Sequence, residues 1–205
     1  MKNYLKLFIY AMALMLAACT QESPTSIVDA TTQPAYITLD RELTRFRTDF
    51  NAMANKIRLV FISGPSCGIC LRGMDDLNES IVASLQGDPR IHTFVVYVPA
   101  LGAEEKHAAA AVPLMQGPRI NHYWDKEGDS GLEFQQALGI PMYAWDVWMM
   151  YEPGVRWEQG VAPPEPAFWQ HQLPSLPKNQ LLDAAEFARV VTASLTRLPP
   201  SSEAT

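Results

Sequence analysis

The feature that most constrains the fold is a buried strand that runs directly into a helix. Residues 59–62 are four consecutive apolar residues, a run typical of a strand covered on both faces of a parallel sheet. A short loop over 63–66 follows, and apolar residues then recur at helical spacing over 70–85. Residues 93–98 form a second apolar strand. Strand, helix and strand with short connections predict a right-handed βαβ unit of an α/β protein.

Further helices are predicted on both sides of this unit. Asp40 is a candidate N-cap for a helix over 40–57, and a C-terminal helix is predicted over 181–198, where consecutive prolines end it. The elements predicted between them are an inserted alanine-rich helix over 104–116, an edge strand over 119–124, and a short helix over 131–138 that Gly139 closes.

The longest strand candidate lies in the C-terminal half of the chain. Residues 141–151 are mostly apolar, and Pro153 and Gly154 are typical of a turn. We therefore expect residues 155–157 to return antiparallel to this strand. The proline-rich residues 161–178 predict a loop laid over the surface.

The composition is that of one globular domain. Apolar residues make up 48% of the chain and charged residues 19%, and no internal repeat is present, so one domain over 36–198 accounts for the pattern. Sixteen Lys and Arg against 22 Asp and Glu give a net charge of −6, without a basic stripe. Because this charge repels a phosphate backbone, no nucleic acid is expected as a partner.

The N-terminus has the order of residues found in export signals. Two lysines precede an apolar run over 7–18, which is too short to cross a bilayer as a helix. Residues 16–19, Leu-Ala-Ala-Cys, resemble the lipobox of bacterial lipoproteins, in which the chain is cut before the cysteine and acyl chains such as palmitate are attached. We therefore predict a signal peptide over 1–18 and lipidation of Cys19. An ordinary secretory signal that contains a cysteine is the alternative.

Polar segments flank the predicted domain. Residues 19–35 are rich in Ser, Thr, Gln and Pro and predict a flexible tether, and residues 199–205 predict a disordered tail. Thr20 follows Cys19, where enteric-type lipoproteins retained at the inner membrane carry Asp. The expected location is therefore the bacterial cell envelope, lipid-anchored on the periplasmic side with the outer membrane favoured. The lipid membrane is then a partner through Cys19.

A Cys-Gly-Ile-Cys motif lies where the first strand ends and its helix begins. The N-terminus of a helix offers free amide donors and the positive end of the helix dipole, both of which stabilise a thiolate. A thiolate is the nucleophile of disulfide exchange. We therefore expect Cys67 to be the exposed attacking thiol. Cys70 shares a side of the helix with Met74 and Leu77, and we expect it to be partly buried and to resolve a mixed disulfide.

Over about residues 40–160 the chain resembles the thioredoxin superfamily. The resemblance rests on the Cys67 and Cys70 pair at the strand-helix junction, on Ile140-Pro141 ahead of a strand, and on the turn at Pro153-Gly154. It implies a thioredoxin-like fold, with a mixed central sheet flanked by helices, an inserted helix and edge strand, and a C-terminal helix. In that family the proline is cis and lies beside the cysteine pair.

The resemblance also implies the function. The chain is expected to be a membrane-tethered periplasmic thiol-disulfide oxidoreductase with a Cys67–Cys70 disulfide, which needs no cofactor and no metal. Cys67 attacks, Cys70 resolves, and Ile140 and Pro141 shape the groove that binds the substrate. Its expected partners are the thiols and disulfides of periplasmic proteins.

Two residues depart from the family pattern. Ser66 replaces the usual aromatic before the first cysteine, and Phe61 replaces the buried acid that assists proton transfer from the buried thiol. Asp146 is a possible substitute for that acid within the apolar run. We expect instead that Asp146 faces water or bonds a backbone amide, because acids are seldom buried without a partner.

Two other functions fit the motif. The first is a metal-binding or metal-delivery lipoprotein, since two thiolates with two imidazoles would hold Zn²⁺ or Cu(I). Its imidazoles would come from His92, His107, His122 and His171, which are scattered without ligand spacing. The second is a non-catalytic binding module in which Cys67 and Cys70 form a merely structural disulfide.

Overall fold

A six-stranded sheet forms the centre of the part of the chain that the computed structural model describes, residues 35–200. β1, β4, β3 and β2 run parallel, β5 is antiparallel to β2, and β6 is antiparallel to β5. The predicted α/β class with a mixed central sheet is therefore confirmed. In spatial order the strands are β1 (Ile37–Thr38), β4 (Ile120–Trp124), β3 (Ile91–Tyr97), β2 (Ile57–Ser63), β5 (Val147–Tyr151) and β6 (Phe168–His171).

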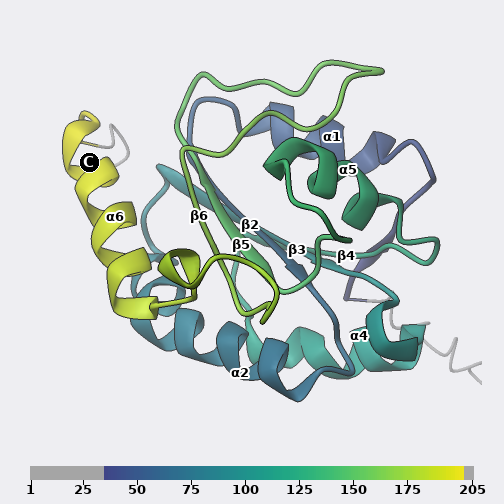
Figure 1. Cartoon of the computed structure of the whole chain (residues 1–205). Helices are drawn as coiled ribbons and strands as arrows, with labels where there is room; N and C mark the ends of the chain where they lie inside the picture. The colour runs from purple at the N-terminus through teal and green to yellow at the C-terminus, as the bar shows by residue number, and fades with distance from the viewer. Residues whose placement is uncertain (1–34, 201–205) are drawn as a thin grey trace, which may run out of the picture. The chain divides into compact units, whose positions relative to one another are not determined.

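Helices cover both faces of this sheet (Figure 1). On one face lie α1 (Thr44–Ala52) and α5 (Asp129–Leu138). On the other lie α2 (Gly68–Leu77), α4 (Glu105–Ala111) and α6 (Ala184–Arg197), and a π-helical turn at Asn78–Val82 joins α2 to the short α3 (Ala83–Leu85). The C-terminal helix and the inserted helix are thus both present.

Alternate side chains of β2 contribute to two separate cores. Every residue of β2 is buried, as its apolar run predicts. Leu59 and Phe61 belong to the core under α2, α4 and α6, where the Phe61 ring packs edge-on against Trp148 with 5.1 Å between centroids. Val60 and Ile62 belong to the core under α1 and α5. β2 is therefore fixed from both sides, and its C-terminal end is a rigid base for the loop that follows.

The first helix is shorter than predicted. It begins at Thr44 because Leu43, with φ 51°, has a left-handed conformation that cannot continue a helix from Asp40. Asp40 still contributes to the start, since its carboxylate accepts a hydrogen bond from the Thr44 amide at 2.7 Å. The helix ends at Ala52, well before residue 57, where β2 has already begun.

β5 begins later than the sequence predicts. The expected strand over 141–151 is extended only from Val147, because Asp146 has φ 56° and interrupts the extended backbone. Residues 155–157 do not return as a strand. The main chain of Trp157 instead exchanges two hydrogen bonds with the side-chain amide of Asn51 in α1, at 2.8 and 2.9 Å.

The strand that pairs with β5 comes from the segment predicted to be a loop. β6 lies within residues 161–178, and its register places Trp148 opposite Gln170. The strand predicted at the edge of the sheet, over 119–124, is β4. It is not an edge strand, because β1 pairs with it on one side and β3 on the other. Both errors concern pairings between distant segments, which local patterns do not encode.

Several predictions lie outside the described residues. They are the signal peptide over 1–18, the lipidation site Cys19, the tether up to residue 34, and the tail from residue 201. Between residues 35 and 200, no helix has the length and apolar character that crossing a membrane requires.

Candidate redox site

The cysteine motif forms the first turn of α2, directly after the end of β2. Cys67 is the N-cap residue of the helix, with an extended backbone, and its Sγ accepts a hydrogen bond from the Cys70 amide at 3.3 Å. Gly64 allows the preceding loop to pack closely, since a Cβ there would lie 3.1 Å from Cε3 of Trp145 and 3.3 Å from Cβ of Ala100. The first sulfur is therefore held at a helix N-terminus against a tightly packed loop.

Cys67 and Cys70 are joined in a disulfide. Their Cα atoms are 5.3 Å apart. Cys67 is 8% exposed, whereas Cys70 is fully buried in the core side of α2. The expectation that Cys67 is exposed is therefore wrong, because both cysteines are buried. Of the two, Cys67 is the one that keeps some contact with solvent.

Asp146 lies beside the disulfide, and both parts of the expectation are wrong. It does not face water, and no backbone amide between residues 35 and 200 donates to its carboxylate. It is 2% exposed, and a carboxylate oxygen and the two cysteine sulfurs all lie within 4.8 Å of one another. β5 pairs antiparallel with β2, and Ile62 lies opposite Val147 at one end of this pairing. Asp146 directly precedes Val147, so it lies at the end of the sheet where α2 begins. Asp146 has a left-handed backbone conformation, which Asp tolerates better than most residues, and β5 therefore begins only at the next residue.

Burial dominates the ionisation of Asp146. It raises the pKa of this carboxyl to about 7, and the side chain of Trp148 offsets part of the effect. Among residues 35–200, Asp146 forms no ion pair. Asp146 therefore changes its charge near neutral pH, the property required of a group that takes and returns a proton.

Sequence reasoning missed Gln172 altogether. Its backbone amide donates to the carbonyl oxygen of Asp146 at 3.2 Å, and its side chain lies between Asp146 and α2. A glutamine in a proline-rich segment gives no signal of its own. Only the pairing of β6 with β5 brings Gln172 to the site.

Ile140 and Pro141, the predicted groove residues, lie in the loop between α5 and β5. Ile140 is buried in the core under α1 and α5, and Pro141 is exposed. The expected cis proline is not observed, since residues 35–200 contain no cis peptide bond. Trp145 is the residue of this loop that packs against Gly64, beside Cys67. Substrate binding by Ile140 and Pro141 stays a prediction.

The four histidines of the metal hypothesis do not gather at the cysteines. Among residues 35–200, Cys67, Cys70 and Asp146 form the group of side chains that could hold a metal ion, and only with the disulfide reduced. Each histidine has a local partner elsewhere. They are His92 with Asn121, His107 with the Glu104 amide, His122 with Tyr97 and the Met115 carbonyl, and His171 with the Leu173 amide and the Pro177 carbonyl.

Apolar residues are exposed next to the cysteine pair. Ile69, between the two cysteines, is 50% exposed, and Leu101, which follows Ala100, is 69% exposed. Leu101 also has φ 54°, an unfavourable backbone conformation for leucine. Ser66 ties the two loops together, because its hydroxyl donates to the Ala100 carbonyl at 3.3 Å.

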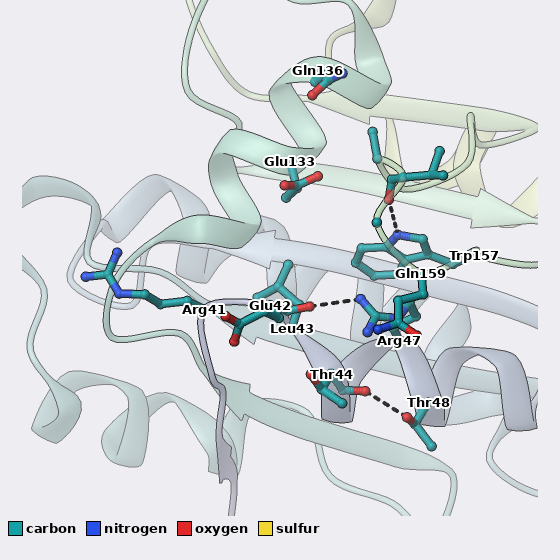
Figure 2. A pocket seen from close by; sticks show the side chains of 13 residues that line it. Arg41, Glu42, Leu43, Thr44, Arg47, Thr48, Glu133, Gln136, Trp157 and Gln159 are labelled. Carbon is teal, nitrogen blue, oxygen red and sulfur yellow. Dashed lines mark hydrogen bonds between the residues drawn. The ribbon is translucent and has the colours of Figure 1, made fainter.

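A separate groove of about 740 Å³ lies between the start of α1, α5 and residues 157–162 (Figure 2). Three of its polar side chains donate to backbone carbonyls of the lining. Arg47 donates to the Glu42 carbonyl, Thr48 donates to the Thr44 carbonyl, and the Trp157 indole donates to the Val161 carbonyl. The groove contains no cysteine and contributes no reactive group to the redox site.

No protein-family model matches the sequence, and no curated protein matches it. Solved structures do. One is a secreted disulfide oxidoreductase of Mycobacterium tuberculosis, homologous to E. coli DsbE, with 12% identity, 69% of this chain and 84% of that chain covered, and a TM-score of 0.46. Another is MTB DsbF, which is 14% identical, with 70% of this chain and 84% of that chain covered and a TM-score of 0.43. A thioredoxin-like protein from Bacteroides caccae is 13% identical, with 68% of this chain and 40% of that chain covered and a TM-score of 0.42.

The order and direction of the strands, with the helices on both faces, identify the fold. The β2-α2-β3 unit is parallel, β5 and β6 follow in antiparallel order, and helices cover both faces of the sheet. A disulfide lies at the first turn of α2, immediately after the central strand. The protein therefore has the thioredoxin-like fold that its sequence predicts.

Proposed function

We propose that this protein is a thiol-disulfide oxidoreductase whose exchanging pair is Cys67 and Cys70. The observation that carries the proposal is the asymmetry of the pair beside a buried acid. Cys67 is the N-cap of α2 and is 8% exposed, Cys70 is fully buried, and the carboxylate of Asp146 lies within 4.8 Å of both sulfurs.

The first step is attack by Cys67. In the reduced protein its thiolate is stabilised by the helix N-terminus and by the Cys70 amide that points to its sulfur. The thiolate attacks one sulfur of a substrate disulfide. A bond forms between Cys67 and that sulfur, the substrate S–S bond breaks, and the other substrate sulfur leaves as a thiolate.

The second step needs the buried thiol to lose its proton. Asp146, as a carboxylate, accepts the proton of Cys70. The new Cys70 thiolate attacks Sγ of Cys67, the internal disulfide forms, and the remaining substrate thiolate leaves. Two electrons have then passed from the cysteine pair to the substrate. The same steps in reverse oxidise a substrate dithiol.

The substrates that suit this site are disulfides or thiols of proteins. Ile69, between the two cysteines, and Leu101, in the loop that Ser66 bonds, have exposed apolar side chains, which favour a polypeptide with accessible apolar residues over a small hydrophilic disulfide. We further propose Ile140 and Pro141 as residues that shape the substrate groove, through the loop that ends at Trp145.

We propose that the protein acts in the bacterial cell envelope. The support is the sequence of the N-terminus, with its export signal over 1–18 and the lipobox-like residues before Cys19. Lipidation of Cys19 would anchor the protein to the periplasmic side of a membrane, and Thr20 favours the outer one. The domain over 36–198 would then act on proteins within reach of its tether.

The test is to trap the intermediate with the full-length chain expressed in a bacterium. In Cys70→Ser the second step is blocked, so we expect mixed disulfides between Cys67 and cell-envelope proteins on non-reducing gels, which disappear on reduction. Cys67→Ser is the matched control and should trap none. Absence of mixed disulfides in Cys70→Ser, together with a Cys67 that does not react with an alkylating reagent, would argue against the proposal. Stoichiometric Zn²⁺ or Cu(I) in the reduced protein would favour the metal-binding alternative.

A further inference from the structure

We propose that Gln172 is a positioning residue of the redox site, which holds the carboxylate of Asp146 at the disulfide and favours its ionised form. The effect of Gln172 on disulfide exchange rests on the proposed function. The hydrogen bond itself, which shifts the ionisation of Asp146, does not depend on that function.

The contacts of Gln172 tie the acid to the helix that carries both cysteines. The backbone amide of Gln172 donates to the Asp146 carbonyl at 3.2 Å. The side-chain amide is oriented with its NH₂ toward Asp146, since in the opposite orientation its oxygen would face only acceptors and its nitrogen only donors. The NH₂ then donates to Asp146 Oδ1 at 3.0 Å and to the Ile69 carbonyl at 3.2 Å.

Gly73 leaves the space that the Gln172 side chain occupies. It lies on the buried side of α2, one turn after Cys70. A Cβ at Gly73 would overlap the end of the Gln172 side chain and would lie 2.8 Å from Cζ2 of Trp148. The amide thus lies between the helix, the indole and the acid.

This confinement has an electrostatic consequence. The groups packed around the Asp146 carboxylate are Cys67 and Cys70 at the start of α2, Trp148 from β5 and Gln172, which directly follows β6. Asp146 forms no ion pair with a cation between residues 35 and 200. A hydrogen bond to a charged acceptor is stronger than one between neutral groups. The Gln172 NH₂ therefore stabilises the carboxylate over the protonated acid, and its loss favours the protonated form.

The first measurement titrates Asp146 in the oxidised full-length protein, by the ¹³C shift of its carboxyl carbon. Gln172→Met preserves the length of the side chain and removes the donor. We expect the Asp146 midpoint to rise by about one pH unit or more. Gln170→Met is the matched control, because Gln170 is a buried residue of β6, two positions before Gln172, whose Oε1 accepts from the Asp183 amide instead. It should leave the midpoint unchanged.

A second variant, Gly73→Ala, disturbs the same side-chain amide by a substitution in α2. Gly73→Ala must displace the Gln172 side chain, so it should raise the Asp146 midpoint in the same direction. The double variant should shift the midpoint no further than Gln172→Met alone, because both changes remove one hydrogen bond. If Gln172→Met does not fold, Gly73→Ala still tests the proposal by itself.

Exchange kinetics then connect the hydrogen bond to function. Below the wild-type midpoint, release of substrate thiol from the Cys67 mixed disulfide should be about tenfold slower in Gln172→Met, and raising the pH should restore it. An Asp146 midpoint equal to that of the wild type in both Gln172→Met and Gly73→Ala would overturn the inference. A shifted midpoint in a protein that exchanges no disulfides would instead uphold the positioning role and reject the oxidoreductase function.

Discussion

At the scale of single residues, Asp146 differs most from what sequence rules indicate. The rule that acids are seldom buried alone predicts a solvent-facing side chain. The chain instead buries Asp146 at the end of the sheet, beside the disulfide and the side-chain amide of Gln172, which follows β6. Residues that break a local rule without a stabilising counter-charge are expected at functional sites. The cost of this burial should therefore be measurable.

Asp146→Asn should stabilise the oxidised protein at alkaline pH. Burial raises the Asp146 pKa from 3.8 to about 7, so the folded state binds this proton more tightly than the unfolded state, and stability falls as pH rises from about 4 to 7. Asn has no charge to bury and also tolerates the left-handed backbone. We expect a gain of roughly 2–4 kcal/mol at pH 8 that vanishes near pH 4, measured by urea unfolding.

The control for this measurement is Asp183→Asn. Asp183 is an exposed N-cap of α6, and Asn serves equally well as an N-cap. It should change stability little at either pH. A wild-type protein that is as stable as Asp146→Asn at pH 8 would show that the carboxylate is not costly where it lies.

At the scale of elements, local patterns predict the βαβ unit and the cysteine turn. The apolar run over 59–62 and the amphipathic helix after it suffice, because a fully buried strand and a helix with one apolar face have distinct periodicities. The pattern fails for β6 and for residues 155–157, whose places depend on partners far away in the chain. For the same reason the sequence identifies Cys67 and Cys70 but not Gln172.

Arg58 shows how such a distant connection is held. It lies on β2 with its side chain buried, and its guanidinium donates to the carbonyls of Phe50, Glu152 and Val155 at 3.3, 2.8 and 2.8 Å. The guanidinium also lies 4.1 Å from the centroid of the Phe50 ring. Burial lowers the pKa of Arg58 to about 10, so it remains charged at neutral pH. It thereby joins the end of α1 to the segment that follows β5.

Arg58→Met should destabilise the protein by roughly 3 kcal/mol or more, because it leaves three carbonyl groups without their donor. Thermal unfolding of the oxidised protein measures the loss. Arg41→Met is the matched control, since the ion pair of Arg41 with Glu127 is exposed, and it should change stability by no more than about 0.5 kcal/mol. Equal stability of the two variants would contradict the role assigned to Arg58.

At the scale of the whole molecule, three separate segments meet at one end of the sheet. The turn after β2 supplies the cysteines, the residue before β5 supplies the acid, and the residue after β6 supplies the amide. Two packed cores hold these strands in register from both faces. The sheet thus holds the cysteines, the acid and the amide together at one end.

The reduction potential of the Cys67 and Cys70 pair tests the central claim most directly. Equilibrating the full-length protein with glutathione buffers, and counting free thiols at each ratio, gives this potential. An exchanging pair is expected between about −120 and −270 mV, the range of known thiol-disulfide oxidoreductases. A potential below about −300 mV, typical of structural disulfides, would contradict the account.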